Sequence, residues 1–195
     1  MNIRIISVTL PLALAIPAMA SAGVPPSDRP LIKPVTNPRW ALEAGAGVLG
    51  YTGGTAAVGP AWNVRATAGI TARVSVEGNY VGSVNKRPDI DRSIVLTAAD
   101  AGVRYDLPHG RRALVVPFVV GGVGISSWAG SGGDGFALTV PVSVGADRML
   151  TRSIKIGARA MFRPSFFDNL GVAGSAKSEP GGDTWGLLAH LGGAF

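Results

Sequence analysis

Two histidines, His109 and His190, are the only imidazoles in the sequence, and cysteine is absent. A serine nucleophile needs a base within hydrogen-bonding reach, and these two side chains are the candidates. We expect His109 to lie in a tight turn, LPHGRR, and the nearest residues on the same strand face as His190 are Leu188 and Gly192. No serine lies near His190 in the sequence, so we predict no catalytic residue and interpret His190 as a hydrogen-bonded interior residue. A serine on a neighbouring strand stays open as the alternative.

The spacing of Gly45, Gly47 and Gly50 matches the G-x-G-x-x-G pattern of dinucleotide-binding loops. Such a site requires a helix after the glycines and an acidic residue about 20 positions later. Here YTGGTAAVGP follows, and the next carboxylate is Glu77. The segment SGGDG supplies a single carboxylate, which is too few for a calcium ion. We therefore predict no cofactor and no metal site, and we expect the three glycines to face a crowded interior.

The elements that must position the polar residues are eight stretches of alternating apolar character, separated by clusters of Gly, Pro, Asn and Asp. They span residues 40–51, 59–69, 73–83, 93–106, 114–128, 135–149, 153–164 and 184–195. None has helical periodicity, and their lengths fit the about 9 to 11 residues of a membrane-crossing strand. We predict an all-β fold, an eight-stranded antiparallel up-and-down transmembrane β-barrel over residues 40–195.

The connections between these stretches differ in length. The second, fourth and sixth are short, whereas residues 84–93 and 165–183 form longer polar segments. Outer-membrane barrels have such an asymmetry, with tight periplasmic turns at one end and longer external loops at the other. Because loops tend to carry function, we predict that these two segments are the contact surfaces.

Composition indicates which face of the strands points inward. Charged residues make up 15% of the chain, compared with roughly 25% in typical soluble domains. The polar faces consist mostly of Gly, Ser, Thr and Asn, which suit a crowded interior better than a wet exterior. The net charge of +6 is spread along the chain, so nucleic-acid binding is not expected.

Nine charged residues share the polar face and should point into the barrel. An eight-stranded barrel is only wide enough for side chains to fill, and an unpaired buried charge costs several kcal/mol. We therefore predict a network of ion pairs and no wide pore, with an ion path as the alternative. If the turn after residue 69 centres on Thr71, Arg65 lies directly opposite Glu77. The predicted network comprises Glu43, Arg65, Glu77, Asp100, Arg104, Asp147, Lys155, Arg159 and Arg163.

Aromatic residues on the apolar face fall near the strand ends. Such belts are typical of the two membrane interfaces, where an amphipathic ring is stable at headgroup level. The belt at the loop ends comprises Trp62, Tyr80, Phe136, Phe162 and Trp185, and the belt at the turn ends comprises Trp40, Tyr105 and Phe195.

The first 39 residues have a different composition. Residues 1–22 combine a positive start at Arg4, an apolar run and the small residues Ala20-Ser21-Ala22, as in a cleaved signal peptide. Pro11 and Pro17 interrupt the apolar run, which disfavours the alternative of a retained transmembrane helix. Residues 23–39 contain five prolines and should form an extended periplasmic leader.

In the final segment, DTWGLLAHLGGAF, the residues Trp185, Leu187, Ala189, Leu191 and Phe195 share one face. This pattern resembles the C-terminal β-signal of bacterial outer-membrane proteins. Residues 40–195 resemble the small eight-stranded OmpA-like and OmpX-like barrels. The resemblance implies that Phe195 is recognised by the barrel-assembly machinery. Lipid A acylation and deacylation enzymes are also built on such barrels, so the resemblance raises an enzymatic alternative.

We therefore predict a non-enzymatic, porin-like barrel protein of a Gram-negative outer membrane, monomeric, with both termini in the periplasm. Its role would be in envelope structure or surface contact through external loops, with membrane lipid around it and an unknown surface partner. The alternatives are a soluble lipocalin-like binding barrel, with an apolar ligand inside, and a lipid A-modifying enzyme.

Overall fold

The computed structural model of the protein describes residues 40–54, 56–87, 92–108, 114–130, 135–151, 153–166 and 182–195. The predicted signal peptide, residues 1–22, and the leader, residues 23–39, lie outside these ranges. No helix long and apolar enough to cross a membrane is found among the described residues. The strands are β1 (Trp40–Tyr51), β2 (Gly59–Gly69), β3 (Val74–Arg87), β4 (Arg92–Asp106), β5 (Val116–Gly130), β6 (Gly135–Thr139), β7 (Val142–Met149), β8 (Ile154–Arg163), β9 (Ser165–Phe166) and β10 (Thr184–Ala194).

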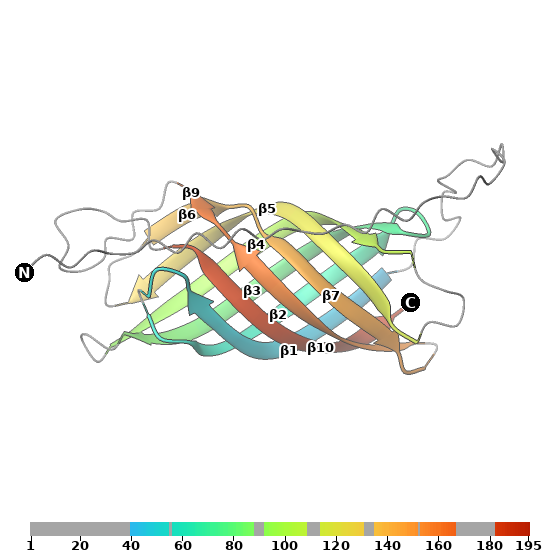
Figure 1. The fold of residues 1–195 in the computed structure, drawn as a ribbon, viewed down its shortest axis with the longest axis horizontal. Coiled ribbons are helices and arrows are strands. Elements are labelled where there is room, and N and C mark those ends of the chain that lie inside the picture. Colours follow the sequence, from blue (N-terminus) through green and yellow to red (C-terminus); the bar gives the residue numbers. More distant parts are fainter. Residues whose placement is uncertain are drawn as a thin grey trace, which may run out of the picture. The chain divides into compact units, whose positions relative to one another are not determined.

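Every strand pairs antiparallel with its neighbours, and the pairing of β4 with β5 closes the sheet into a barrel (Figure 1). β6 and β7 continue one another, because both pair with β5 in the same register. They are separated only at Pro141, which has no N–H to donate to the ladder, and Pro164 separates β8 from β9 in the same way. The described residues therefore form the predicted all-β, eight-stranded, up-and-down barrel.

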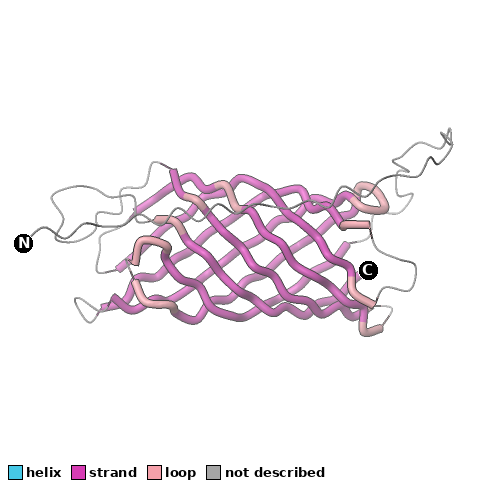
Figure 2. Tube along the Cα trace, viewed as in Figure 1, coloured by secondary structure: helices cyan, strands magenta, loops and turns pink. Residues whose placement is uncertain are grey.

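The strands run between two ends of the barrel (Figure 2). We call one end the turn end. It holds the connections at residues 70–73, 107–115 and 150–153 together with Trp40 and Phe195, whose backbones hydrogen-bond to each other at 3.3 and 2.7 Å. The opposite end, where β1 connects to β2 and β3 to β4, is the loop end. The two strand ends at residues 40 and 195 thus meet at the turn end.

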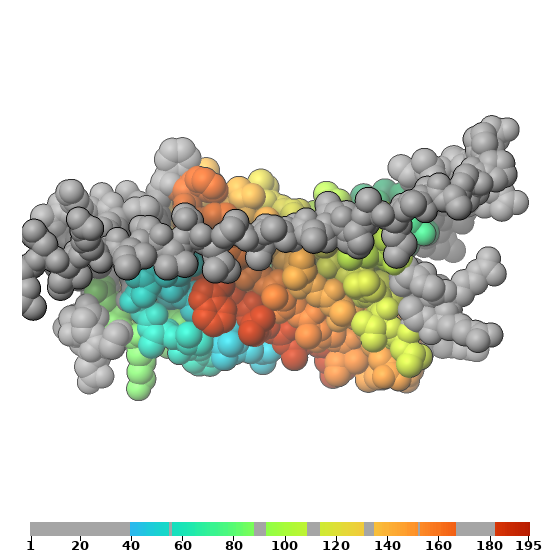
Figure 3. Space-filling view, in the orientation of Figure 1, coloured from blue at the N-terminus to red at the C-terminus, as the bar shows by residue number. Residues whose placement is uncertain are grey.

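The outer face of the wall is apolar. Val140, Val142 and Ile156 are 40%, 49% and 42% exposed, whereas Arg159 is 4% exposed in the interior. Parts of β8 and β10 are visible on the outer surface in the space-filling view (Figure 3). This distribution is the reverse of that in a soluble barrel, where the apolar residues fill the centre.

The β2–β3 hairpin differs from the prediction by a shift in register. Arg65 lies opposite Asn79 and Thr67 opposite Glu77, so the predicted direct pair between Arg65 and Glu77 is wrong. The reason is the side chain of Thr71, whose Oγ1 accepts hydrogen bonds from the backbone N–H groups of residues 73 and 74 at 3.2 and 2.9 Å. This cap centres the turn on residue 72 instead of 71.

The predicted external loop at residues 84–93 is also mostly strand, because β3 extends to Arg87 and β4 begins at Arg92. The extension is stabilised by Asn85, which is buried and donates hydrogen bonds to the carbonyl oxygens of Leu49 at 2.7 Å and Ala57 at 2.9 Å. Of the second predicted loop, 165–183, residues 165–166 form β9 and residues 167–181 lie outside the described residues.

Candidate functional site

The interior of the barrel brings together the charged residues that alternation assigned to the polar face. They project from six strands, and all are buried or nearly buried. The set is Glu43 from β1, Arg65 from β2, Glu77 from β3, Asp100 and Arg104 from β4, Asp147 from β7, and Lys155, Arg159 and Arg163 from β8.

The centre of the interior contains two acid groups shared by three cations. Arg65 lies opposite Glu43 in the β1–β2 ladder and donates from Nε to Glu43 Oε2 at 2.6 Å. Lys155 Nζ lies 3.0 Å from the other oxygen of Glu43. Arg159 binds Glu77 through two parallel hydrogen bonds of 2.6 and 2.7 Å, and Arg65 Nε lies 3.8 Å from the same carboxylate. Glu77 therefore interacts with both arginines, although it faces neither across a ladder.

Two further arginines extend the network toward the two ends. Arg163 donates from Nη2 to Asp100 Oδ1 at 2.9 Å and to the hydroxyl of Ser126 at 3.1 Å. Toward the turn end, Arg104 donates from Nη1 to Asp147 at 2.6 Å and from Nε to Asp106 at 2.7 Å. Bidentate and shared contacts of this kind are the form in which a buried charge is tolerated.

Phe118 on β5 fills the space between the arginines and was not anticipated from the sequence. Its ring is 1% exposed, and the guanidinium carbons of Arg104, Arg159 and Arg65 lie 3.9, 5.3 and 5.8 Å from the ring centre. A cation near the face of an aromatic ring is attracted by the ring quadrupole. Phe118 thus separates three like charges while occupying the middle of the lumen.

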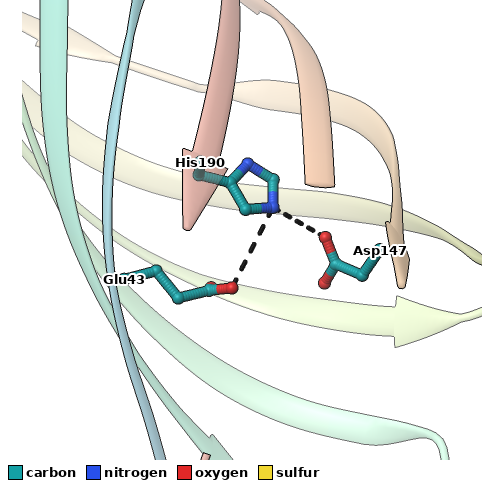
Figure 4. Close-up of side chains that lie close together, drawn as sticks. All are labelled: Glu43, Asp147 and His190. Carbon is teal, nitrogen blue, oxygen red and sulfur yellow. Dashed lines mark hydrogen bonds and ion pairs between the residues drawn. The ribbon is translucent and has the colours of Figure 1, made fainter. Parts of the chain in front are cut away.

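His190 completes a cluster with two of these carboxylates (Figure 4). Its Nε2 lies 2.7 Å from Asp147 Oδ1 and 3.9 Å from Glu43 Oε1. Three such groups could in principle hold a metal ion, but Lys155 Nζ already lies 3.0 and 3.2 Å from the two carboxylates. Two arginines bind the same acids, so a divalent ion would add positive charge to a site already neutralised. The residues do not fit a metal centre.

The surroundings of His190 do not form a nucleophile pair either. Its partners across the two neighbouring ladders are Gly45 and Gly157, and its hydrogen-bond partner is Asp147. None of these neighbours carries a hydroxyl group, so His190 has no nucleophile to activate among them. His109 lies outside the described residues.

The glycine motif is divided between the two faces. A side chain at Gly47 would come within 1.9 Å of the backbone oxygen of Leu187, and one at Gly45 within 2.3 Å of Asn63 Oδ1. These two glycines allow close approach in the crowded interior, as expected. Gly50 instead lies on the outer face against the ring of Trp185, so the expectation that all three face the lumen is wrong.

Between the centre and the loop end the interior also contains large apolar side chains, which were not anticipated from the sequence. These buried, inward-facing side chains come from β1, β3, β4, β5, β8 and β10, and buried polar residues such as Ser83, Asn85 and Thr184 lie at the same end. The signal was present in β4, where Ile94 and Leu96 share parity with Asp100. This apolar layer comprises Leu49, Val81, Leu96, Trp128, Met161 and Leu188.

At the turn end, by contrast, the lumen is hollow. A cavity of about 510 Å³ lies there, with Arg104, Asp147 and Lys155 in its lining and Trp40 and Val74 among its apolar residues. Among the described residues, side chains therefore fill the centre of the lumen, and the turn end contains a cavity.

The predicted aromatic residues lie on the outer face. Trp40, Trp62, Tyr80, Tyr105, Phe136, Phe162 and Phe195 are exposed, and Trp185 is half-buried. Two tryptophans lie over glycines directly across a ladder, Trp62 over Gly82 and Trp185 over Gly50. An aromatic ring covers the backbone that a glycine would otherwise expose.

Comparison with known proteins gives similarity of fold without similarity of sequence. No family model matches the chain. No curated protein matches it either. Neisserial surface protein A is similar in structure with a TM-score of 0.56 at 17% identity, over 81% of this chain and 97% of that one.

Two further structures give the same result. The outer membrane protein OprG from Pseudomonas aeruginosa has a TM-score of 0.54 at 12% identity, over 82% and 96% of the two chains. Ail, the attachment invasion locus protein of Yersinia pestis, has a TM-score of 0.53 at 10% identity, over 82% and 99%. The chain therefore has the fold of the small eight-stranded outer-membrane β-barrels.

Proposed function

We propose that this protein is an integral outer-membrane barrel that acts without catalysis, in envelope structure or in surface contact. The observation that carries the proposal is the separation of the two faces. The outer face of the strands is apolar, and the ionised residues pair inside. A band of this kind is stable in hydrocarbon, where every backbone polar group must be satisfied within the closed sheet.

The filled interior supports a barrel that conducts little. The ion pairs around Phe118 occupy the centre, and Leu96 and Trp128 belong to the apolar layer beyond them. An ion crossing the lumen would have to break buried pairs and pass the apolar side chains, and both steps cost free energy. We therefore propose a closed, porin-like scaffold and no wide pore.

The absence of catalysis is supported by the environment of His190. Its contacts are carboxylates and its cross-strand neighbours are glycines, which suits a structural role in the ion-pair network. A lipid A-modifying enzyme would need a nucleophile within reach of this base. Mass spectrometry of lipid A from cells with and without the gene tests this alternative, and an acylation difference between them would overturn our proposal.

Export and insertion into the outer membrane would depend on the two ends of the chain. We propose that residues 1–22 direct export and are cleaved, and that Phe195, which is 82% exposed at the turn end, is recognised by the barrel-assembly machinery. The aromatic residues at the strand ends would lie at the membrane interfaces, with lipid around a monomeric barrel. Any surface partner would contact the loop end.

The experiment that tests location and orientation is proteolysis of intact cells. Trypsin cleaves after lysine and arginine, and Lys177 is the only such residue in the sequence of the longest loop-end connection, residues 167–183. We expect the protein in the membrane pellet, with cleavage at Lys177 in intact cells and the barrel fragments retained. A matched Lys177→Gln variant should resist this cut. A protein released into the periplasm without detergent would contradict the proposal.

A further inference from the structure

Two connections at the turn end have the same construction, and we call them the twin turns. In residues 70–74, the N–H groups of Ile70 and Thr71 donate to the carbonyl of Val74 at 2.8 and 2.9 Å. In residues 150–154, of which residue 152 is not described, the N–H groups of Leu150 and Thr151 donate to the carbonyl of Ile154 at 2.8 and 3.3 Å.

The threonine hydroxyl closes each of the twin turns from within. Thr71 Oγ1 accepts the N–H groups of residues 73 and 74, and Thr151 Oγ1 accepts those of residues 153 and 154. The aliphatic residue before each threonine is left on the surface, and Ile70 and Leu150 are 50% and 53% exposed. Each turn thus presents an exposed apolar side chain at the end of its strands.

Unpaired cations accompany these aliphatic residues. Arg73 lies in the first of the twin turns, and Arg148 lies on the outer face of β7 directly before the second, and both are exposed. Within the part of the chain that the structure describes, neither has an ion-pair partner, whereas the lumen arginines are bound to carboxylates. The sequences of all three turn-end connections, 70–73, 107–115 and 150–153, contain no Asp or Glu. The two turns are separated by β1 and β10 on one side of the barrel and by β4 and β5 on the other, so each forms its own surface that complements an anion.

We propose that the twin turns bind anionic phospholipid, with Arg73 and Arg148 on the headgroup phosphates and Ile70 and Leu150 in the adjoining acyl region. Arginine suits phosphate because its planar donors can bind two oxygens at once. The neighbouring aliphatic side chains distinguish a lipid from a polysaccharide or an acidic protein, because a basic and apolar surface is stable at the boundary of headgroups and acyl chains. Each surface also continues the apolar outer band, because Val76 beside the first turn and Ile154 beside the second are exposed. The inference concerns the end opposite the loops and goes beyond the function proposed above.

Native mass spectrometry of the folded protein in detergent, titrated with phosphatidylglycerol or phosphatidylcholine, tests the proposal. We expect the wild type to retain phosphatidylglycerol preferentially and Arg73→Gln/Arg148→Gln to lose this preference. One arginine at an anionic lipid surface is worth about 1 kcal/mol, so the expected loss is about fivefold in affinity at each turn. Lys86→Gln, which changes an exposed cation at the end of β3, is the matched control and should bind as the wild type does.

A second pair of variants tests the apolar part. Ile70→Ser/Leu150→Ser keeps both arginines and should weaken phosphatidylglycerol binding, while free glycerol phosphate should not compete with the lipid in the wild type. All four substituted positions are exposed, so folding should be retained, and heat-modifiable electrophoretic mobility checks it. Equal retention of the two lipids by the wild type, or an unchanged preference in the arginine variant, would overturn the proposal. Full competition by glycerol phosphate would mean that the turns bind the phosphate group alone, and this result would also overturn the proposal.

Discussion

Substitution of Glu77 by glutamine tests whether the interior ion pairs stabilise the fold. Glu77 is 4% exposed, receives two hydrogen bonds from Arg159 at 2.6 and 2.7 Å, and lies 3.8 Å from Arg65. Glutamine keeps the shape but removes the negative charge, which leaves two guanidinium groups near each other without their shared acid. Breaking a buried pair from one side costs about 3 to 5 kcal/mol.

The assay is urea unfolding of the barrel in lipid vesicles, followed by the fluorescence of the four tryptophans. Glu77→Gln should lower the free energy of unfolding by that amount. Arg159→Met should do the same alone, and the double variant should lose less than the sum, by about 2 kcal/mol, because it leaves no unpaired partner of the bidentate contact. A loss below about 1 kcal/mol for Glu77→Gln, with additive effects in the double variant, would refute the account of the network.

Three further predictions follow from the two faces of the wall. Phe118→Ala removes the ring between three arginines, and we expect a rise in single-channel conductance across a planar bilayer; an unchanged trace would argue against the filled lumen. Val144→Arg on the outer face should lower the free energy of unfolding by about 2 to 4 kcal/mol, whereas Val144→Thr should cost much less. Gly82→Ala would place a methyl group 2.4 Å from the ring of Trp62 and should shift its emission and lower stability, whereas Gly78→Ala, on the same face of β3 with nothing within 4 Å, should not.

The strands could be predicted because their two faces meet different surroundings. In β6 and β7 an apolar residue alternates with a small or charged one from Phe136 to Asp147, so side-chain parity alone separates outside from inside. The same parity predicted which charged residues share the lumen. It could not predict their partners, because the pairing depends on how the ladders are shifted around the whole barrel.

The alternation of apolar and polar residues could not predict the register of the β2–β3 hairpin. Whether Arg65 faces Glu77 or Asn79 depends on the centre of the turn, and the side chain of Thr71 decides it by capping two backbone N–H groups. A threonine early in a short turn is a readable signal, and its repetition at Thr151 gives the same hydrogen bonds. The shift of one position in the turn centre moves each cross-strand partner by two residues.

The apolar layer at the loop end was missed for a different reason. Leu96 and Trp128 lie on the inward faces of β4 and β5, and the charged residues on the same inward parity, such as Asp100 and Arg104, suggested a uniformly polar interior. Phe118 was missed in the same way, since its three arginine neighbours come from three other strands. Contacts between distant strands need the closed barrel before they can be recognised.

The most direct test of the two-faced wall uses the absence of cysteine from the chain. Single cysteines replacing Val144, which is 54% exposed, and the adjacent Ser143, which is 6% exposed, can each carry the same environment-sensitive fluorophore. In vesicles made with brominated acyl chains, we predict strong quenching of the label at position 144 and little at position 143. Quenching at position 143 with a water-exposed label at position 144 would contradict the assignment of the apolar face to lipid.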